Sequence, residues 1–181
     1  MGKSSAISLI GLAGWFALKL YGLGTLPWES SITMGVLWHF TTFIALAVYG
    51  ARAGFQSQEE HFLDRWKSSA QGTARHALLV SVAMGLWYYV IAPGALENQK
   101  RSQIEQVQQA LGNSTRFESL QAAQPELSHL SREDVLKTQM NNLDVFYSPV
   151  FFIGLSLLMW LFVGLFSAAL MDLIWQRIWS H

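Results

Sequence analysis

The longest stretch without a charged or histidine side chain covers residues 145–171. A helix of this length rises about 40 Å at 1.5 Å per residue, which is enough to cross the roughly 30 Å hydrocarbon core of a bilayer with some tilt. Charged residues make up 13% of the chain, about half the share usual in soluble domains, and the mean hydropathy is +0.25. The sequence therefore predicts an integral membrane protein.

Composition and motifs exclude several kinds of site. The chain has no Cys, which rules out disulfides, thiolate metal sites and cysteine nucleophiles, and its formal net charge of zero lacks the basic excess typical of nucleic-acid binding. It contains no phosphate-binding glycine loop, zinc-binding His-Glu-x-x-His motif, nucleophile elbow or aspartate-rich sugar-transferase motif. We therefore expect no enzymatic activity, no metal, no cofactor and no nucleic-acid partner.

Three further spans are expected at residues 6–26, 32–51 and 76–92. The first could instead be a cleaved signal peptide, but its apolar run continues past Lys19 to Leu26, which is too long for the apolar region of such a peptide. Its glycines predict close packing against other helices, as do Gly154, Ser156, Gly164 and Ala168 in the last span.

Two polar segments separate these spans. Residues 55–73, between the second and third spans, have the pattern of an amphipathic helix on the membrane surface, although a solvated connector would also fit. Residues 97–144 are polar but contain apolar residues at helical spacing, a helix stop at Gly112 and a capping box that begins at Ser131. The last of these helices is expected to continue into the fourth span with a kink near Pro149.

These segments define an all-α fold. We expect an integral membrane four-helix bundle with a helical extracytoplasmic insertion between the third and fourth spans. Residues 1–96 would hold the first three spans, residues 97–144 the insertion, and residues 145–181 the fourth span and the C-terminal end.

The distribution of Lys and Arg predicts the orientation, because loops on the cytoplasmic side are rich in these residues. Lys3 precedes the first span, four basic residues lie between the second and third spans, and Arg177 follows the fourth. Lys100 and Arg101 lie on the opposite side and count against this assignment, but they are outnumbered. Both termini are therefore expected in the cytoplasm.

The chain resembles a known family over nearly its whole length, most visibly in two segments. These are the segment that begins Phe62-Leu63-Asp64-Arg65-Trp66-Lys67 and the end of the third span, Tyr88-Tyr89-Val90-Ile91-Ala92-Pro93-Gly94. These residues look like those of the bacterial membrane family catalogued as domain of unknown function 4199. The resemblance implies four spans with a long polar loop before the last, and a location in the bacterial inner membrane. It implies no activity and no catalytic residues.

Ionisable residues within the spans are candidates for function, because charge at membrane depth is costly. Lys19 and His39 are expected at a similar depth in the outer half of the bilayer. Together with Trp38, Tyr88 and Tyr89 they could line an outer-leaflet cavity that binds an anionic lipid or a lipid-linked sugar. In the structural alternative, Lys19 extends to the membrane surface and His39 donates a hydrogen bond to a neighbouring helix.

A second set of charged residues is expected to be structural. Asp172, near the cytoplasmic end of the fourth span, could form an ion pair with Arg52 or Arg75 from neighbouring helices. Such a pair would relieve the cost of charge near the membrane edge.

The leading functional hypothesis is a non-enzymatic accessory or scaffold subunit that packs against a membrane-protein partner or against copies of itself. The alternative is a binder or carrier of an anionic lipid. A secondary transporter is less favoured, because four spans are few for alternating access. The surrounding lipid bilayer is the common partner in each case.

Overall fold

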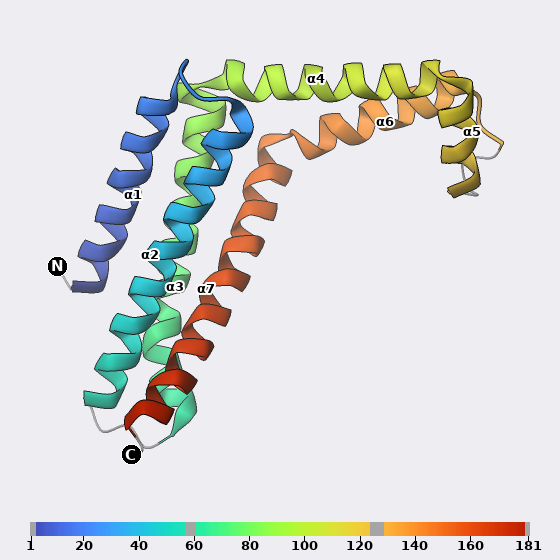
Figure 1. Ribbon diagram of the computed structural model, residues 1–181. Helices are drawn as coiled ribbons and strands as arrows, with labels where there is room; N and C mark the ends of the chain where they lie inside the picture. Colours follow the sequence, from blue (N-terminus) through green and yellow to red (C-terminus); the bar gives the residue numbers. More distant parts are fainter. Residues whose placement is uncertain (1–2, 57–60, 124–128, 180–181) are drawn as a thin grey trace. The chain divides into compact units, whose positions relative to one another are not determined.

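The computed structural model describes residues 3–56, 61–123 and 129–179, and all regular structure in these ranges is helical. The elements are α1 (Lys3–Gly22), α2 (Trp28–Gln56), α3 (Phe62–Leu86), the π-helical turn η1 (Trp87–Ile91), α4 (Pro93–Gly112), α5 (Ser114–Ala123), α6 (Arg132–Phe146) and α7 (Pro149–Trp179) (Figure 1). Four segments are long and apolar enough to cross a membrane: Lys3–Gly22, Trp28–Gln56, Phe62–Ile91 and Pro149–Ile178. These findings confirm the predicted all-α fold with four membrane-length helices.

The chain divides into two compact units. The first unit comprises Met1–Met84 and Ile153–His181, and therefore contains α1, α2, most of α3 and most of α7. In Figure 1 these four helices run alongside one another. The second unit, Gly85–Phe152, contains η1, α4, α5 and α6 with the adjoining ends of α3 and α7.

Glycines bring α1, α2 and α3 into close contact in the first unit. A Cβ atom added to Gly11 of α1 would lie 2.9 Å from Thr42 Oγ1 of α2, and one added to Gly35 would lie 2.9 Å from Trp15 Nε1 of α1. On the next interface, a Cβ atom on Gly50 of α2 would overlap the backbone of Ser69 in α3. Membrane helices associate through such small residues because lipid provides no hydrophobic driving force between them. The predicted packing role of the first span is confirmed at Gly11.

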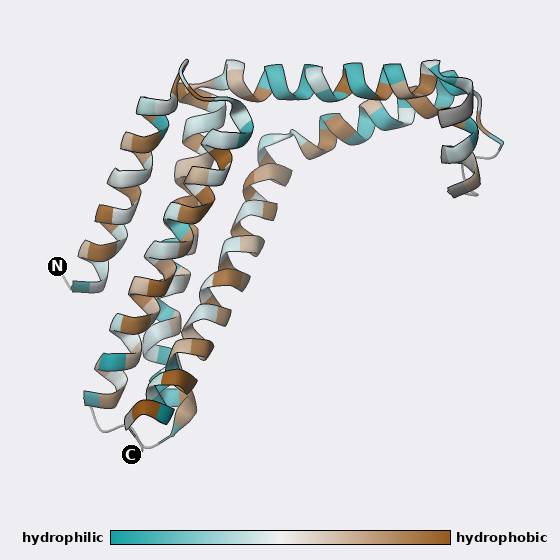
Figure 2. Cartoon of the chain, in the orientation of Figure 1, coloured by the Kyte–Doolittle hydropathy of each residue, from teal (hydrophilic) through white to brown (hydrophobic). Residues whose placement is uncertain are grey.

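Helix α7 uses only part of its predicted small-residue face. A Cβ atom on Gly164 would lie 2.9 Å from Phe43 of α2 and 3.1 Å from Thr73 of α3, and Ala168 is fully buried. Gly154 has no neighbour within 4 Å of such an atom and therefore does not pack against another described helix. Figure 2 shows brown, apolar residues along much of α7, as expected for a helix that meets lipid.

The segment between the second and third spans differs from its prediction as a separate surface helix. Residues 57–60 lie outside the described residues, and α3 begins at Phe62 and continues without interruption to Leu86. The polar start and the apolar end of α3 are thus one helix. Its buried side includes Arg65, Ser69, Thr73 and His76, which recur every three or four residues and so share one face.

The junction before α7 also differs from the prediction of a kinked continuous helix. Helix α6 ends at Phe146 and α7 begins at Pro149, so the continuous helix is wrong. Ser148 Oγ accepts a hydrogen bond from the Phe151 amide at 3.4 Å. Proline suits the first position of a helix because the N–H that it lacks would have no partner there. Pro149 therefore starts a helix instead of bending one.

The second unit has its own small core, formed where α4, α5 and α6 meet. Leu111, Phe117 and Val135 are buried together. Ser131 caps α6 by accepting a hydrogen bond from the Asp134 amide at 3.2 Å, which confirms the helix start predicted at Ser131. Helix α4 ends at Gly112, as predicted. The polar segment before the last span is therefore helical.

Candidate functional sites

Aromatic and histidine rings from all four helices of the first unit meet in one cluster, which we call the histidine cluster. It consists of Trp15 from α1, His39 and Phe43 from α2, His76 from α3 and Trp160 from α7. The ring centroids of His39 and His76 are 5.7 Å apart. His39 also lies 5.4 Å from Trp15 and 5.3 Å from Trp160, while Phe43 lies 4.9 Å from His76 and 5.6 Å from Trp160.

Both histidines of the cluster are almost completely buried, with exposed fractions of 1% for His39 and 0% for His76. None of their four ring nitrogens has a hydrogen-bond partner among the described residues. A neutral imidazole carries one donor and one acceptor, and leaving such groups unpaired in apolar surroundings costs about 1 to 3 kcal/mol each. Two neighbouring imidazoles can share a proton or hold a polar ligand, so the pair is a candidate functional site.

Lys19 has a structural contact that the sequence did not reveal. Its ammonium group donates hydrogen bonds to the carbonyl oxygen and the hydroxyl oxygen of Ser31, at 3.1 and 3.0 Å, and also lies 5.9 Å from the centroid of the Trp15 ring. Its exposed fraction is 4%. Since Trp15 also contacts His39, the structure brings Lys19 and His39 to the same indole ring. The charge of Lys19 is directed at the beginning of α2.

Trp38 joins two helices. Its indole nitrogen donates a hydrogen bond of 2.6 Å to the carbonyl oxygen of Gly11 in α1. It also lines a pocket of about 210 Å³ between α1 and α2, whose other lining residues are Ile7, Ile10, Gly11, Thr41, Thr42 and Ala45. None of the described residues that line this pocket is charged. It can accommodate an apolar chain but provides no partner for an anionic group.

Tyr88 and Tyr89, the remaining candidates for the predicted cavity, belong to the second unit. The Tyr89 hydroxyl donates a hydrogen bond of 2.8 Å to the carbonyl oxygen of Tyr147, and the rings of Tyr88 and Phe152 lie 5.6 Å apart, edge to face. These contacts hold η1 against Tyr147, which follows α6, and against the first turn of α7. They give both tyrosines a packing role within the second unit.

The buried carboxylate of Asp172 is paired with Arg65, whereas Arg52 and Arg75 were the expected partners. Arg65 Nε lies 3.6 Å from Asp172 Oδ1, a distance that suits an ion pair but is too long for a hydrogen bond. The exposed fractions are 6% for Arg65 and 0% for Asp172. Because α3 is continuous, Arg65 lies on its buried face and reaches α7, whereas Arg52 and Arg75 are exposed.

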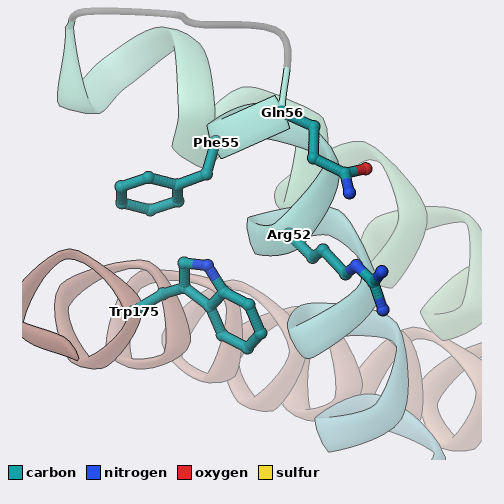
Figure 3. Close-up of a pocket in the computed structure, with 4 residues that line it drawn as sticks. All are labelled: Arg52, Phe55, Gln56 and Trp175. Atoms are coloured by element: carbon teal, nitrogen blue, oxygen red, sulfur yellow. The ribbon is translucent and has the colours of Figure 1, made fainter. Parts of the chain in front are cut away.

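A larger pocket lies where α2 and α7 end. Its volume is about 500 Å³, and it is lined by Arg52, Phe55, Gln56 and Trp175. In Figure 3 the rings of Phe55 and Trp175 lie on one side of the pocket, and the polar ends of Arg52 and Gln56 lie on the other. No Asp or Glu of the described residues lines it. We call this the Arg52 pocket.

Sequence reasoning identified His39 but missed its neighbour His76, and it also missed the Arg52 pocket. The signal for His76 was present, since Arg65, Ser69, Thr73 and His76 are polar at helical spacing. That spacing places them on one face of a helix that continues into an apolar span. The pocket depends on how the ends of two helices converge, which residue spacing within each helix does not encode.

Comparison of the chain with protein-family models, with curated proteins and with solved structures finds no match. The resemblance to domain of unknown function 4199 therefore stays a prediction. Independently of that resemblance, the structure is a helical chain with four membrane-length helices.

Proposed function

We propose that the chain is a non-enzymatic accessory or scaffold subunit that binds a membrane-protein partner through the outer face of α7. The observation that supports this proposal is the exposure of α7. In each candidate span we compared the share of buried residues within an apolar stretch of 18 residues. This share is smallest in α7, at 22%, and largest in α3, at 44%. A helix of this length with so few contacts in its own chain leaves a long surface for another helix.

The outer face of α7 carries large apolar side chains at helical spacing. Leu155, Leu158, Met159, Phe162 and Phe166 are all exposed, and the rings of Phe162 and Phe166 are stacked 6.3 Å apart. Lipid can cover such a face, but a stacked aromatic pair also forms a ridge that fits between the side chains of a facing helix. Helices in membranes associate through this kind of van der Waals packing.

A second contact surface is proposed on the second unit. Met140, Val145 and Phe146 of α6 are exposed apolar residues in a helix whose other exposed residues are polar. Exposed apolar side chains that gather on one element are typical of interaction sites. The helices α4 to α6 would thus give the partner a contact outside the bilayer.

The proposed location is the bacterial inner membrane, with both termini in the cytoplasm and α4 to α6 on the outer side. It is supported by basic residues at the ends of the membrane-length helices. Arg52 lies near the C-terminal end of α2, Lys67 lies near the start of α3, and Arg177 lies near the C-terminal end of α7. This pattern is typical of cytoplasmic loops.

Site-specific photo-crosslinking in native membranes tests the partner surface. A photoreactive amino acid at Phe162 should give one adduct of defined mass, either with a second protein or with another copy of this chain. The same group at Leu79, an exposed apolar residue of α3, is the matched control and should give lipid adducts only. Lipid adducts alone at both positions would contradict the proposal.

A further inference from the structure

The Arg52 pocket combines a cation, an amide and two aromatic rings, and this combination matches one kind of molecule. A guanidinium group donates paired hydrogen bonds to phosphate oxygens, and the Gln56 amide can donate to a neighbouring ester or hydroxyl oxygen. The rings of Phe55 and Trp175 provide an apolar wall on the other side of the pocket (Figure 3). A molecule that is anionic at one end and apolar at the other would complement these residues.

The position of the pocket along the helices agrees with such a ligand. Arg52 directly follows the apolar run of α2, and Trp175 lies four residues beyond the uncharged stretch that ends at Met171. Helix α7 keeps exposed apolar side chains on both sides of Trp175, at Ile174 and Ile178. Tryptophan and arginine at this depth are typical of the boundary between hydrocarbon and lipid headgroups.

Arg52 and Arg65 differ in their ion pairs among the described residues. The Arg52 side chain is exposed and forms no salt bridge with any residue that the structure describes, whereas Arg65 is already paired with Asp172. A pocket of about 500 Å³ is within the range that holds small-molecule ligands. It is therefore large enough for a phosphate headgroup and the first part of its acyl chains.

We propose that the Arg52 pocket binds the headgroup of an anionic phospholipid from the surrounding leaflet, with the phosphate on Arg52 and the glycerol and acyl region against Phe55 and Trp175. This site differs from the cavity predicted around Lys19, whose ammonium group is bound to Ser31. It lies at the proposed cytoplasmic end of the bundle. It does not depend on a protein partner.

Native mass spectrometry of the delipidated full chain tests the site by titration with phosphatidylglycerol and, separately, with phosphatidylcholine. Arg52→Gln removes the charge and keeps a polar side chain of similar length. It should weaken phosphatidylglycerol binding about 10- to 100-fold, because a hydrogen bond to a charged group contributes that factor. Trp175→Ala should weaken binding of the same lipid through loss of the apolar wall.

Arg75→Gln is the matched control, because it removes one exposed arginine outside the pocket. It should leave phosphatidylglycerol binding within about twofold of the unmodified chain. Equal losses of phosphatidylglycerol binding in the Arg52 and Arg75 variants would overturn the proposal, because they would show general charge attraction. Equal binding of phosphatidylcholine and phosphatidylglycerol would also overturn it, because the site would then not select an anionic lipid. Displacement of the lipid by millimolar inorganic phosphate would also overturn it, since a soluble anion would then suffice.

Discussion

Substitution of Gly50 by Ala tests the packing of α2 against α3 directly. The added Cβ would overlap the Ser69 backbone and would lie 3.0 Å from Ser69 Cβ and 2.6 Å from Ser69 Oγ. Carbon atoms in contact prefer about 3.5 to 4.0 Å, so the two helices must separate by at least about 0.5 to 1 Å at this level. Ser69 belongs to a helix and cannot yield locally. The hydrogen bond from Ser69 Oγ to the Ala47 carbonyl oxygen, now 3.2 Å, would lengthen as the helices separate.

The expected loss follows from these contacts. Overpacking costs about 1 to 3 kcal/mol, and the weakened interhelical hydrogen bond adds about 0.6 kcal/mol. The higher helix propensity of Ala returns up to about 1 kcal/mol. Gly50→Ala should therefore lower the free energy of unfolding by about 1 to 3 kcal/mol. Gly154→Ala, in open space on α7, should have no effect or raise it by up to about 1 kcal/mol.

Equilibrium unfolding in mixed micelles, followed by tryptophan fluorescence, measures both variants under the same conditions. Each variant replaces a helical glycine by alanine, so the effect of helix propensity cancels when their free energies of unfolding are subtracted. The reasoning would be refuted if Gly50→Ala were as stable as Gly154→Ala, since the close contact with Ser69 would then not exist.

Three further predictions concern polar contacts. Asp172→Ala should cost about 3 to 5 kcal/mol in the same unfolding assay, because Arg65 would lose its buried carboxylate; a cost below about 1 kcal/mol would argue against a buried pair. Ser131→Ala should cost about 1 kcal/mol through loss of the α6 cap, measured as earlier thermal loss of helical circular dichroism. The hydrogen bond of 2.8 Å to Asp144 raises the pKa of Lys100, so this pair stabilises the second unit below pH 10.5 and the contribution disappears as the pH rises through the raised pKa. The stability difference between the unmodified chain and Lys100→Gln should accordingly vanish at high pH, and a constant difference would contradict this assignment.

The sequence was sufficient for features that depend on local chemistry. Predominantly apolar stretches of membrane length identified four helices, and the cap at Ser131 and the stop at Gly112 located the start of α6 and the end of α4. Each of these signals acts within one helical turn or one continuous apolar run. Pro149 was misjudged because proline is compatible with both a kink and a helix start, and neighbouring residues decide between them.

The candidate sites depended on contacts between helices, which the sequence specifies less directly. Arg65 was assigned to a surface helix because charged residues surround it, yet its own side chain lies on the buried face of α3. Lys19 was predicted to need a ligand or the membrane surface, and it finds Ser31 at the start of the next helix instead. In both cases the partner lies on another element, where spacing within one helix gives no information.

The histidine cluster joins all four membrane-length helices, so the contact between His39 and His76 tests the architecture most directly. Solid-state NMR of the chain in bilayers, with ring carbons and nitrogens of histidine labelled, can detect this contact. With ring centroids 5.7 Å apart, a through-space cross-peak between the His39 and His76 rings is expected, and it should disappear in His39→Phe. Absence of that cross-peak in the folded, unmodified protein would contradict the four-helix arrangement described for the first unit.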